Sequence, residues 1–468
     1  MGTLSGLLAL TTAALDADQS AINITANNVA NQSTPGYTRE TVNFVSNDAV
    51  SLSGYQGLDG SVSATAVSVR SRVLEQQLQQ QTQSSTASTA VLTALQNIQS
   101  MFGLTSTSAD ASSTALGSAM NSFFSSLTAL SSNPTDAATQ TAVLTAASSL
   151  ASAFNSTSQG LSNEVISLNT QIATAAQQVN GLTATVAQLN QQITSLSPNQ
   201  DAGTLEDARQ QAILQLSSIL GVDQITTQNN GVTLTASDGT VLVSGNQNYA
   251  LSTITVNGNT AIVAGDPPTT LPNDIQGGSI GGMLQARDQA IPPMQSAIDQ
   301  LAYAIGTAVN TQNEAGTTAS GTAGTAIFTL PTTANGAAAT LSIVLTSGTG
   351  IATAGAGEGP SGTTNALALA NLGTANIVSG QTASNNFASF IGSIGTAVSS
   401  ATTQNTANTA SLAQAQTQRD SLSAVSLDDE ATSLTNYQRS YEAAAKVFDI
   451  VDQMMADALN LGQQTPVS

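Results

Sequence analysis

The 468-residue sequence contains no cysteine, no histidine and no tryptophan, and its single lysine is Lys446. Without cysteine and histidine, zinc sites built on thiolate and imidazole ligands cannot form, nor can nucleophilic sites of the Ser–His–Asp or Cys–His type. A phosphate-binding loop that ends in Gly-Lys-Ser/Thr is excluded too, because Lys446 stands in a different context. We therefore expect neither metal nor cofactor, and catalysis could rest only on paired carboxylates.

Positive charge is scarce as well. Eight Lys and Arg residues stand against 28 Asp and Glu residues, which gives a net charge of −20, yet only 8% of all residues are charged. Nucleic acids and anionic membrane surfaces need basic patches, so neither is expected as a partner. The polar surface is built from Ser, Thr, Asn and Gln. It could reduce like-charge repulsion between copies of the chain, or it could be no more than a soluble exterior.

Long apolar runs are also missing. No stretch approaches the 18 apolar residues of a membrane span. The segment from Met1 to Leu8 lacks a basic region and is followed by no small-residue cleavage site, so we expect no conventional signal peptide.

Apolar residues recur every seven positions at both ends of the chain, which predicts an amphipathic helix at each end. The first helix is expected over residues 4–30, ahead of a type II turn at Pro35-Gly36, and the second over the last forty residues up to Gly462. The proposed apolar positions are Leu8, Leu15, Ile22 and Val29 at the start, and Leu427, Leu434, Tyr437, Tyr441, Phe448, Val451 and Met455 at the end.

Neither terminal helix can bury its stripe alone, so the two helices are expected to lie together. The pattern leaves open whether they finish folding on neighbouring subunits or close one domain as an antiparallel pair. Asp428, Asp429 and Glu430 begin the second helix, where acids oppose the helix dipole; a cation site there is the less favoured interpretation.

The middle of the chain alternates between helical and strand patterns. A helical zone is expected over about 65–220, and its heptad segment 161–196, whose flanks carry almost no charge besides Glu164, should pack on helices of the same chain. Asp238-Gly239 between alternating apolar residues predicts a hairpin. Helices should return over 282–309, kinked or divided near Pro292-Pro293, and over 387–417.

These patterns predict a mainly α-helical, elongated subunit of nested domains with β insertions. Its terminal helices pair as a coiled coil, and a helical middle domain and a small β domain follow. The expected divisions are 1–50 with 425–468 for the terminal domain, 51–313 with 387–424 for the middle domain including a β region at 222–263, and 314–386 for a small β-rich outer domain or mobile insertion.

Short blocks at both ends resemble the signatures of the flagellar rod, hook and hook-associated family. The N-terminal block includes Asn27, Asn28, Asn31, Pro35, Gly36, Tyr37 and Arg39, and its Gly-Tyr form is similar to the FlgK branch, whereas rod and hook members tend to carry Gly-Phe. The C-terminal block contains Leu427-Asp428-Asp429-Glu430, Tyr437-Gln438 and Tyr441-Glu442-Ala443. In the middle, 130–136, 205–209 and 277–284 are similar to the helical domain of that branch.

The resemblance implies a structural subunit, not an enzyme, at the junction between the flagellar hook and filament. Such subunits leave the cell through the flagellar type III export channel and assemble by packing of their terminal helices. The implied partners are copies of the chain in a ring, hook subunits, a second junction protein (FlgL-type) and an export chaperone (FlgN-type).

Two alternatives stay open. A hook or distal rod subunit would share the terminal blocks but would not predict the heptad segment at 161–196. An axial protein with a carboxylate-dependent hydrolase insertion is less favoured, because residues 314–386 hold only Glu314 and Glu358 as acids.

Overall fold

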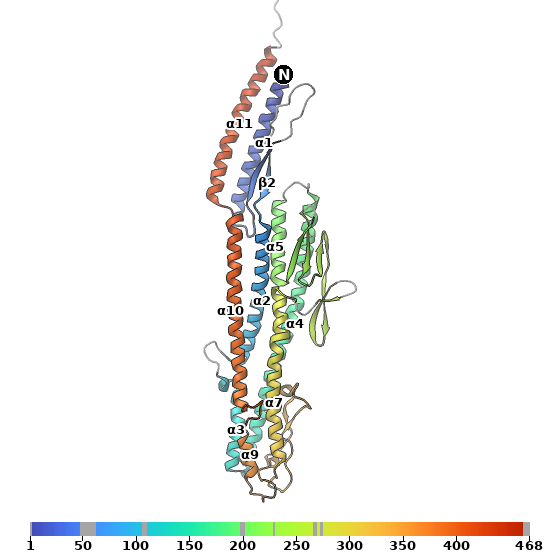
Figure 1. Ribbon diagram of the computed structural model, residues 1–468, viewed down its shortest axis with the longest axis vertical. Helices are drawn as coiled ribbons and strands as arrows, with labels where there is room; N and C mark the ends of the chain where they lie inside the picture. Colours follow the sequence, from blue (N-terminus) through green and yellow to red (C-terminus); the bar gives the residue numbers. More distant parts are fainter. Residues whose placement is uncertain are drawn as a thin grey trace, which may run out of the picture.

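The molecule is an elongated rod built mainly of helices, with the first and last helices side by side at one tip (Figure 1). The computed structural model describes residues 2–46, 62–104, 110–196, 202–227, 230–264, 269–271 and 275–461. The helices are α1 (Gly2–Asn31), α2 (Arg72–Met101), α3 (Ala115–Ser132), α4 (Ala137–Ser195), α5 (Gly203–Ile219), α6 (Gly278–Gln285), α7 (Ile291–Glu314), α8 (Ala337–Thr340), α9 (Thr364–Asn371), α10 (Ala383–Ser423) and α11 (Leu427–Leu461).

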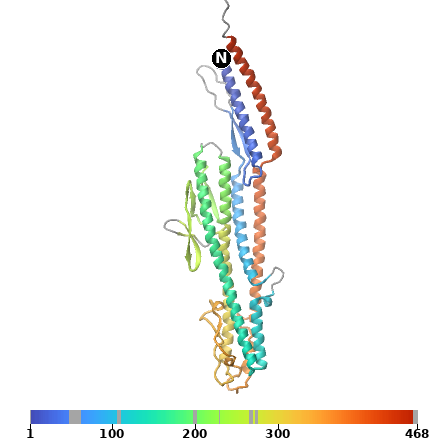
Figure 2. The same ribbon diagram turned by 180° about the vertical axis from the view of Figure 1, so that it is seen from behind.

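The terminal helices α1 and α11 pack antiparallel, and α2 and α10 continue the rod below them (Figures 1 and 2). Strands β1 (Glu40–Ser46) and β2 (Val62–Ser68) form an antiparallel hairpin beside the pair. The predicted turn after α1 is confirmed: the Tyr37 N–H donates to the Thr34 carbonyl at 3.1 Å, and Gly36 has φ +82°. The predicted end of α11 at Gly462 lies outside the described residues.

The longest helix in the middle of the rod is α4, a single helix of 59 residues against which its neighbours pack. Its predicted heptad positions Leu161, Leu168, Ile172 and Val179 are buried in the same chain, in one core with residues of α2, α5 and the neighbouring sheets. The heptad segment therefore packs within the chain, as its lack of flanking charge predicts.

Two small antiparallel sheets lie along α4. The first has the order β3 (Val222–Thr226), β4 (Val232–Ala236), β5 (Val241–Ser244) and β6 (Gln247–Asn248), and the second β7 (Leu251–Val256), β8 (Asn259–Ala264) and β9 (Thr269–Thr270). The predicted hairpin at Asp238-Gly239 is confirmed as the connection between β4 and β5, where Leu234 pairs with Val243 and both are buried.

The irregularity predicted near Pro292-Pro293 is a π-helical turn just ahead of the two prolines, and the helical conformation continues through it. Helix α6 passes through a π-helical turn (Ala286–Ala290) into α7, whose first turn holds both prolines because the N–H groups there need no helical partner. The turn points the buried Arg287 at β8, where its guanidinium donates to the Thr260 carbonyl at 2.6 Å and pairs with Asp288 at 2.7 Å.

The segment after α7 folds at the tip opposite the chain ends (Figure 1). It contains α8, α9 and two paired strands of two residues each, β10 (Phe328–Thr329) and β11 (Ser342–Ile343). Asparagines of α7 hold its loops: Asn310 Oδ1 accepts from the Phe328 N–H at 2.8 Å, and Asn313 Oδ1 accepts from the Ala352 N–H at 2.9 Å.

The predicted fold class, mainly α with β insertions and paired terminal helices, is confirmed by this arrangement. Among the described residues, no helix combines the length and the hydropathy needed to cross a bilayer.

Candidate assembly interface

The interior of the terminal pair is narrow and built from small side chains. Ala17, Ala21 and Ile24 of α1 and Val451 of α11 are buried. The predicted apolar positions of the two terminal helices, which we call the seam, surround this interior. Most of their side chains are not fully buried in the single chain. Half-buried seam positions are Leu8, Leu15, Ile22, Val29, Leu434, Tyr437, Phe448 and Met455, whereas Leu427 and Tyr441 are exposed.

A second apolar strip lies on the outer face of α11. Val447, Ile450 and Met454 are 45%, 57% and 52% exposed. Their spacing of i, i+3 and i+7 places them on one helix face, about 100° around the helix from Phe448 and Met455. The seven-residue repeat does not include these three residues, so the sequence prediction missed the strip. Their i, i+3 and i+7 spacing is the sequence pattern that would have revealed it.

The β1–β2 hairpin extends the exposed apolar surface. Phe44, Val45 and Val67 are each more than 40% exposed. The Phe44 ring lies 6.1 Å from the ring of Tyr437, centroid to centroid, so the hairpin packs against α11. We call α1, α11 and the β1–β2 hairpin the terminal unit. It exposes large apolar side chains on both α11 and the hairpin, and such surfaces in soluble chains mark interaction sites.

Below this surface, four signature residues form one buried polar cluster. Glu430 accepts from Arg39 Nε at 2.7 Å and from Asn28 Nδ2 at 3.0 Å. Asn28 Oδ1 in turn accepts from the Tyr37 hydroxyl at 2.9 Å and the Glu40 N–H at 3.0 Å. Burial, followed by the carboxylates of Glu40, Asp207 and Glu430, raises the pKa of Tyr37 to about 12, which keeps it a donor. This cluster ties α1, its turn and α11 together, and we call it the polar lock.

The same turn is bonded to the middle of the rod. Thr38 donates to Asp207 of α5 through its N–H at 2.8 Å and its hydroxyl at 2.6 Å, and Arg70 pairs with Asp207 and Glu206. The Arg39 N–H donates to the carbonyl of Ser423, the last residue of α10, at 2.9 Å. These bonds fix the direction of the terminal pair relative to the rod.

The remaining signature residues have local roles or face solvent. Asn31 Nδ2 donates to the Asn27 carbonyl at 3.0 Å near the end of α1. Pro35 is exposed at the turn, and Gln438 is exposed on α11. The sequence thus identified the members of the lock but not Glu430 as its centre, since an acid in the first turn of a helix also fits a dipole partner.

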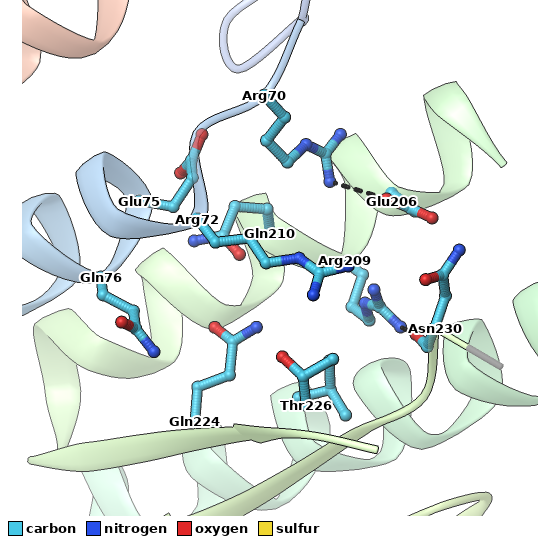
Figure 3. Close-up of a pocket in the computed structure, with 11 residues that line it drawn as sticks. Arg70, Arg72, Glu75, Gln76, Glu206, Arg209, Gln210, Gln224, Thr226 and Asn230 are labelled. Carbon is cyan, nitrogen blue, oxygen red and sulfur yellow. Dashed lines mark hydrogen bonds and ion pairs between the residues drawn. The ribbon is translucent and has the colours of Figure 1, made fainter. Parts of the chain in front are cut away.

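Figure 3 shows a small cavity beside Arg70 that is lined by both acids and arginines. Its volume is about 60 Å³, whereas ligand sites usually measure about 300–1,000 Å³. Burial raises the pKa of Glu75 and lowers the pKa of Arg209 to about 10. Glu206 is ion-paired with Arg70, and Arg209 donates to the Asn230 carbonyl at 2.6 Å. Arg70, Glu206 and Arg209 are thus held by structural bonds, and the cavity is too small to admit a sugar chain.

The acids of the outer segment are likewise no catalytic pair. Glu358 accepts from the Gly355 N–H at 2.8 Å and from Thr364, whose hydroxyl and N–H, with Gly355, lower the pKa of Glu358. Glu314 is exposed at the end of α7. Within the described ranges, no cluster of three or more acidic side chains could hold a metal ion.

Comparison with known proteins finds three matching family models. Residues 101–328 match the family described as "Flagellar hook-associated protein FlgK helical domain". Residues 11–38 match "Flagella basal body rod protein", and residues 416–461 match "Flagellar basal body rod FlgEFG protein C-terminal". The two terminal matches cover the helices of the lock, and the central match covers much of the rod.

Whole-chain relatives agree with the family matches. The chain is 28% identical to "Flagellar hook-associated protein 1" of Bacillus subtilis over 497 residues, covering 96% of each protein. It is 28% identical to the Escherichia coli protein of that name, covering 70% of this chain and 60% of the relative. The solved "flagellar hook junction protein FlgK from Burkholderia pseudomallei" has the same fold, with a TM-score of 0.66 and 18% identity over 75% of this chain and all of that one.

Proposed function

From its similarity to hook-associated protein 1 over nearly the whole chain, we propose that the chain belongs to the FlgK family and is a structural subunit of the bacterial flagellum that forms the junction between hook and filament. It is a building part and not an enzyme, and it works outside the cell as a section of the flagellum. The observation that carries the proposal is the central match over residues 101–328, because the two terminal matches are shared with rod proteins.

The assembly surface is the terminal unit. Burying the remaining exposed half of Val447, Ile450 and Met454 against a neighbour would stabilise a subunit contact by about 2–4 kcal/mol. The same contact would further bury the seam side chains that are only half-buried in the single chain. The domain division follows: residues 1–50 and 425–468 assemble, 51–313 and 387–424 form the outer rod, and 314–386 lies at its tip.

The partners follow from this position in the flagellum. Copies of the chain form a ring, hook subunits lie on one side of it, and a second junction protein (FlgL-type) lies on the other. An export chaperone (FlgN-type) binds the chain before it leaves the cell. No nucleic acid or membrane is involved.

Electron microscopy of cells that lack the gene, with flagellin assayed in the medium, tests the position. Complete hooks without filaments, together with flagellin lost to the medium, are expected. Missing hooks would assign the chain to the hook or distal rod instead, and normal flagella in a strain without a second copy of the gene would refute the proposal.

A complementation experiment tests the surface. Phe448→Asp places a charge in the half-buried seam and should leave hooks without filaments while the middle of the rod stays folded. Gln453→Asp is the matched control for the seam, because Gln453 is exposed and lies about 140° around α11 from Phe448. Full filaments with Phe448→Asp would mean that the seam does not carry assembly.

A further inference from the structure

Three arginines surround the small cavity of Figure 3, at the point where the β1–β2 hairpin leads into the rod. Arg70 stands just ahead of α2, Arg72 is the first residue of α2, and Arg209 lies in α5. The whole chain has only eight basic side chains against 28 acidic ones. Three of those eight line one cavity, so positive charge is concentrated here in a strongly acidic chain.

The two acids that line the cavity do not neutralise all three arginines. Glu206 pairs with Arg70 at 3.3 Å. Glu75 is 5% exposed, and its burial raises its pKa, which disfavours the carboxylate. Among the residues that the structure describes, no carboxylate forms an ion pair with Arg72 or Arg209. The cavity therefore holds two guanidinium groups whose charge is not paired.

Arg209 is the buried member of this pair. It is 6% exposed, and its Nη1 donates to Asn190 Oδ1 at 3.0 Å and to the Asn230 carbonyl at 2.6 Å, both of which are neutral acceptors. Burial is the main cause that lowers the pKa of Arg209 to about 10; Glu206 opposes the shift, and the charges of the two other arginines add to it. A buried cation with only neutral partners is costly, and an anion beside it would offset that cost.

Arg72 is the member that faces solvent. Figure 3 shows its side chain reaching from the start of α2 towards Arg209, with Gln224 and Thr226 of β3 below them. Within the described part of the chain, nothing accepts a hydrogen bond from Arg72. Exposure alone would fit a solvated side chain, but two guanidinium groups that line one cavity repel each other unless an anion lies between them. The exposure of Arg72 leaves such an anion a path from solvent.

The size and the donors of the cavity select the ligand. Its volume of about 60 Å³ is room for roughly four to six water-sized atoms, since one water needs about 10–15 Å³ of such volume. Phosphate and sulfate have that size, and guanidinium groups match their oxygens with two hydrogen bonds at a time. Side-chain amides that can supply further donors line the same cavity: Gln76, Gln210 and Gln224.

We propose that this cavity binds a small divalent oxyanion, inorganic phosphate or sulfate, between Arg72 and Arg209. The two positive charges without ion pairs match the two negative charges of the ligand. The bound anion joins the start of α2 to α5, next to the place where Arg70 pairs with Glu206. This site does not depend on the proposed function, because it lies within a single chain.

Equilibrium dialysis of the purified full chain against radiolabelled phosphate, at constant ionic strength in sodium chloride, tests the site. We expect saturable binding of one phosphate per chain. Displacement by unlabelled sulfate would assign the site to divalent oxyanions in general, and retention of phosphate in excess sulfate would assign it to phosphate alone. No saturable binding of phosphate overturns the proposal.

Arg72→Gln locates the bound ion. Because Arg72 is exposed and bonds to no described residue, the variant should melt at the same temperature as the unchanged chain when no phosphate is present. It should bind phosphate about 10- to 100-fold more weakly, the loss expected for one pair of charge-assisted hydrogen bonds. Phosphate should then raise the melting temperature of the unchanged chain but not that of the variant.

Arg439→Gln is the matched control, since it removes the same charge at an exposed position of α11 outside the cavity. It should bind phosphate as tightly as the unchanged chain. Unweakened binding by Arg72→Gln, or an equal loss in both variants, would show that phosphate is held by general attraction and would overturn the site.

Discussion

Truncating Glu430 to alanine should loosen α11 from α1 and its turn without unfolding the rod. The Glu430 side chain is 3% exposed and accepts from Arg39 Nε and Asn28 Nδ2, so its loss leaves a guanidinium without its partner. Breaking a fully buried pair costs about 3–5 kcal/mol. The Arg39 side chain is 27% exposed, and water can replace part of the bond, so we expect about 2–3 kcal/mol.

Amide hydrogen exchange measures this local loss. A cost of 2–3 kcal/mol corresponds to roughly 30- to 150-fold faster exchange through local opening at the end of α1 and the start of α11. Exchange in α3 and α4 should not change, because no bond of the lock reaches them. Asp429→Ala is the control, since Asp429 is exposed next to Glu430. Unchanged exchange in α11, or equal acceleration throughout α3 and α4, would refute the lock as described.

Three further changes have defined outcomes. Gly282→Ala should destabilise the rod by about 1–3 kcal/mol in denaturant titrations, because the added Cβ would lie 2.2 Å from a carbonyl oxygen of α2. Gly392→Ala is the contrasting variant: the added Cβ would meet no neighbouring group within 4 Å, so it should stabilise the rod by about 0.5–1 kcal/mol. Burial raises the pKa of Glu75 above its usual 4.5 and disfavours its charged form, so Glu75→Gln should raise the unfolding free energy near pH 7; the gain should fade as the pH falls through the raised pKa towards 4.5 and be absent below it. The raised pKa of Tyr37, about 12, means that its neutral phenol contributes stability that is present below pH 10 and lost as the pH rises through 12; alkaline unfolding of Tyr37→Phe should lack this loss.

Features set by short-range sequence could be predicted, and those set by distant contacts could not. The terminal helices, the turn at Gly36 and the hairpin at Asp238-Gly239 each follow from a repeat or a backbone preference within a few residues. Glu430 and Asn28 are far apart in the sequence, and no local pattern pairs them. Likewise, Gly282 stands in a glycine run that resembles the family, but its physical reason is the close passage of α6 over α2.

The terminal pair combines a weak apolar interior with a directional polar lock, and this division suits a part that repeats. Ala17 and Ala21 bring α1 and α11 close together but bury little area, so hydrophobic burial alone would not fix the angle of the pair, since that force has no direction. Hydrogen bonds have direction, and those of Asn28 and Glu430 set the angle. The larger apolar side chains, such as Ile450, are thereby held outward in one fixed orientation. In the proposed ring each subunit meets identical neighbours, and it would need that orientation before it assembles, because a freely swinging pair would lose contact energy to the entropy of ordering.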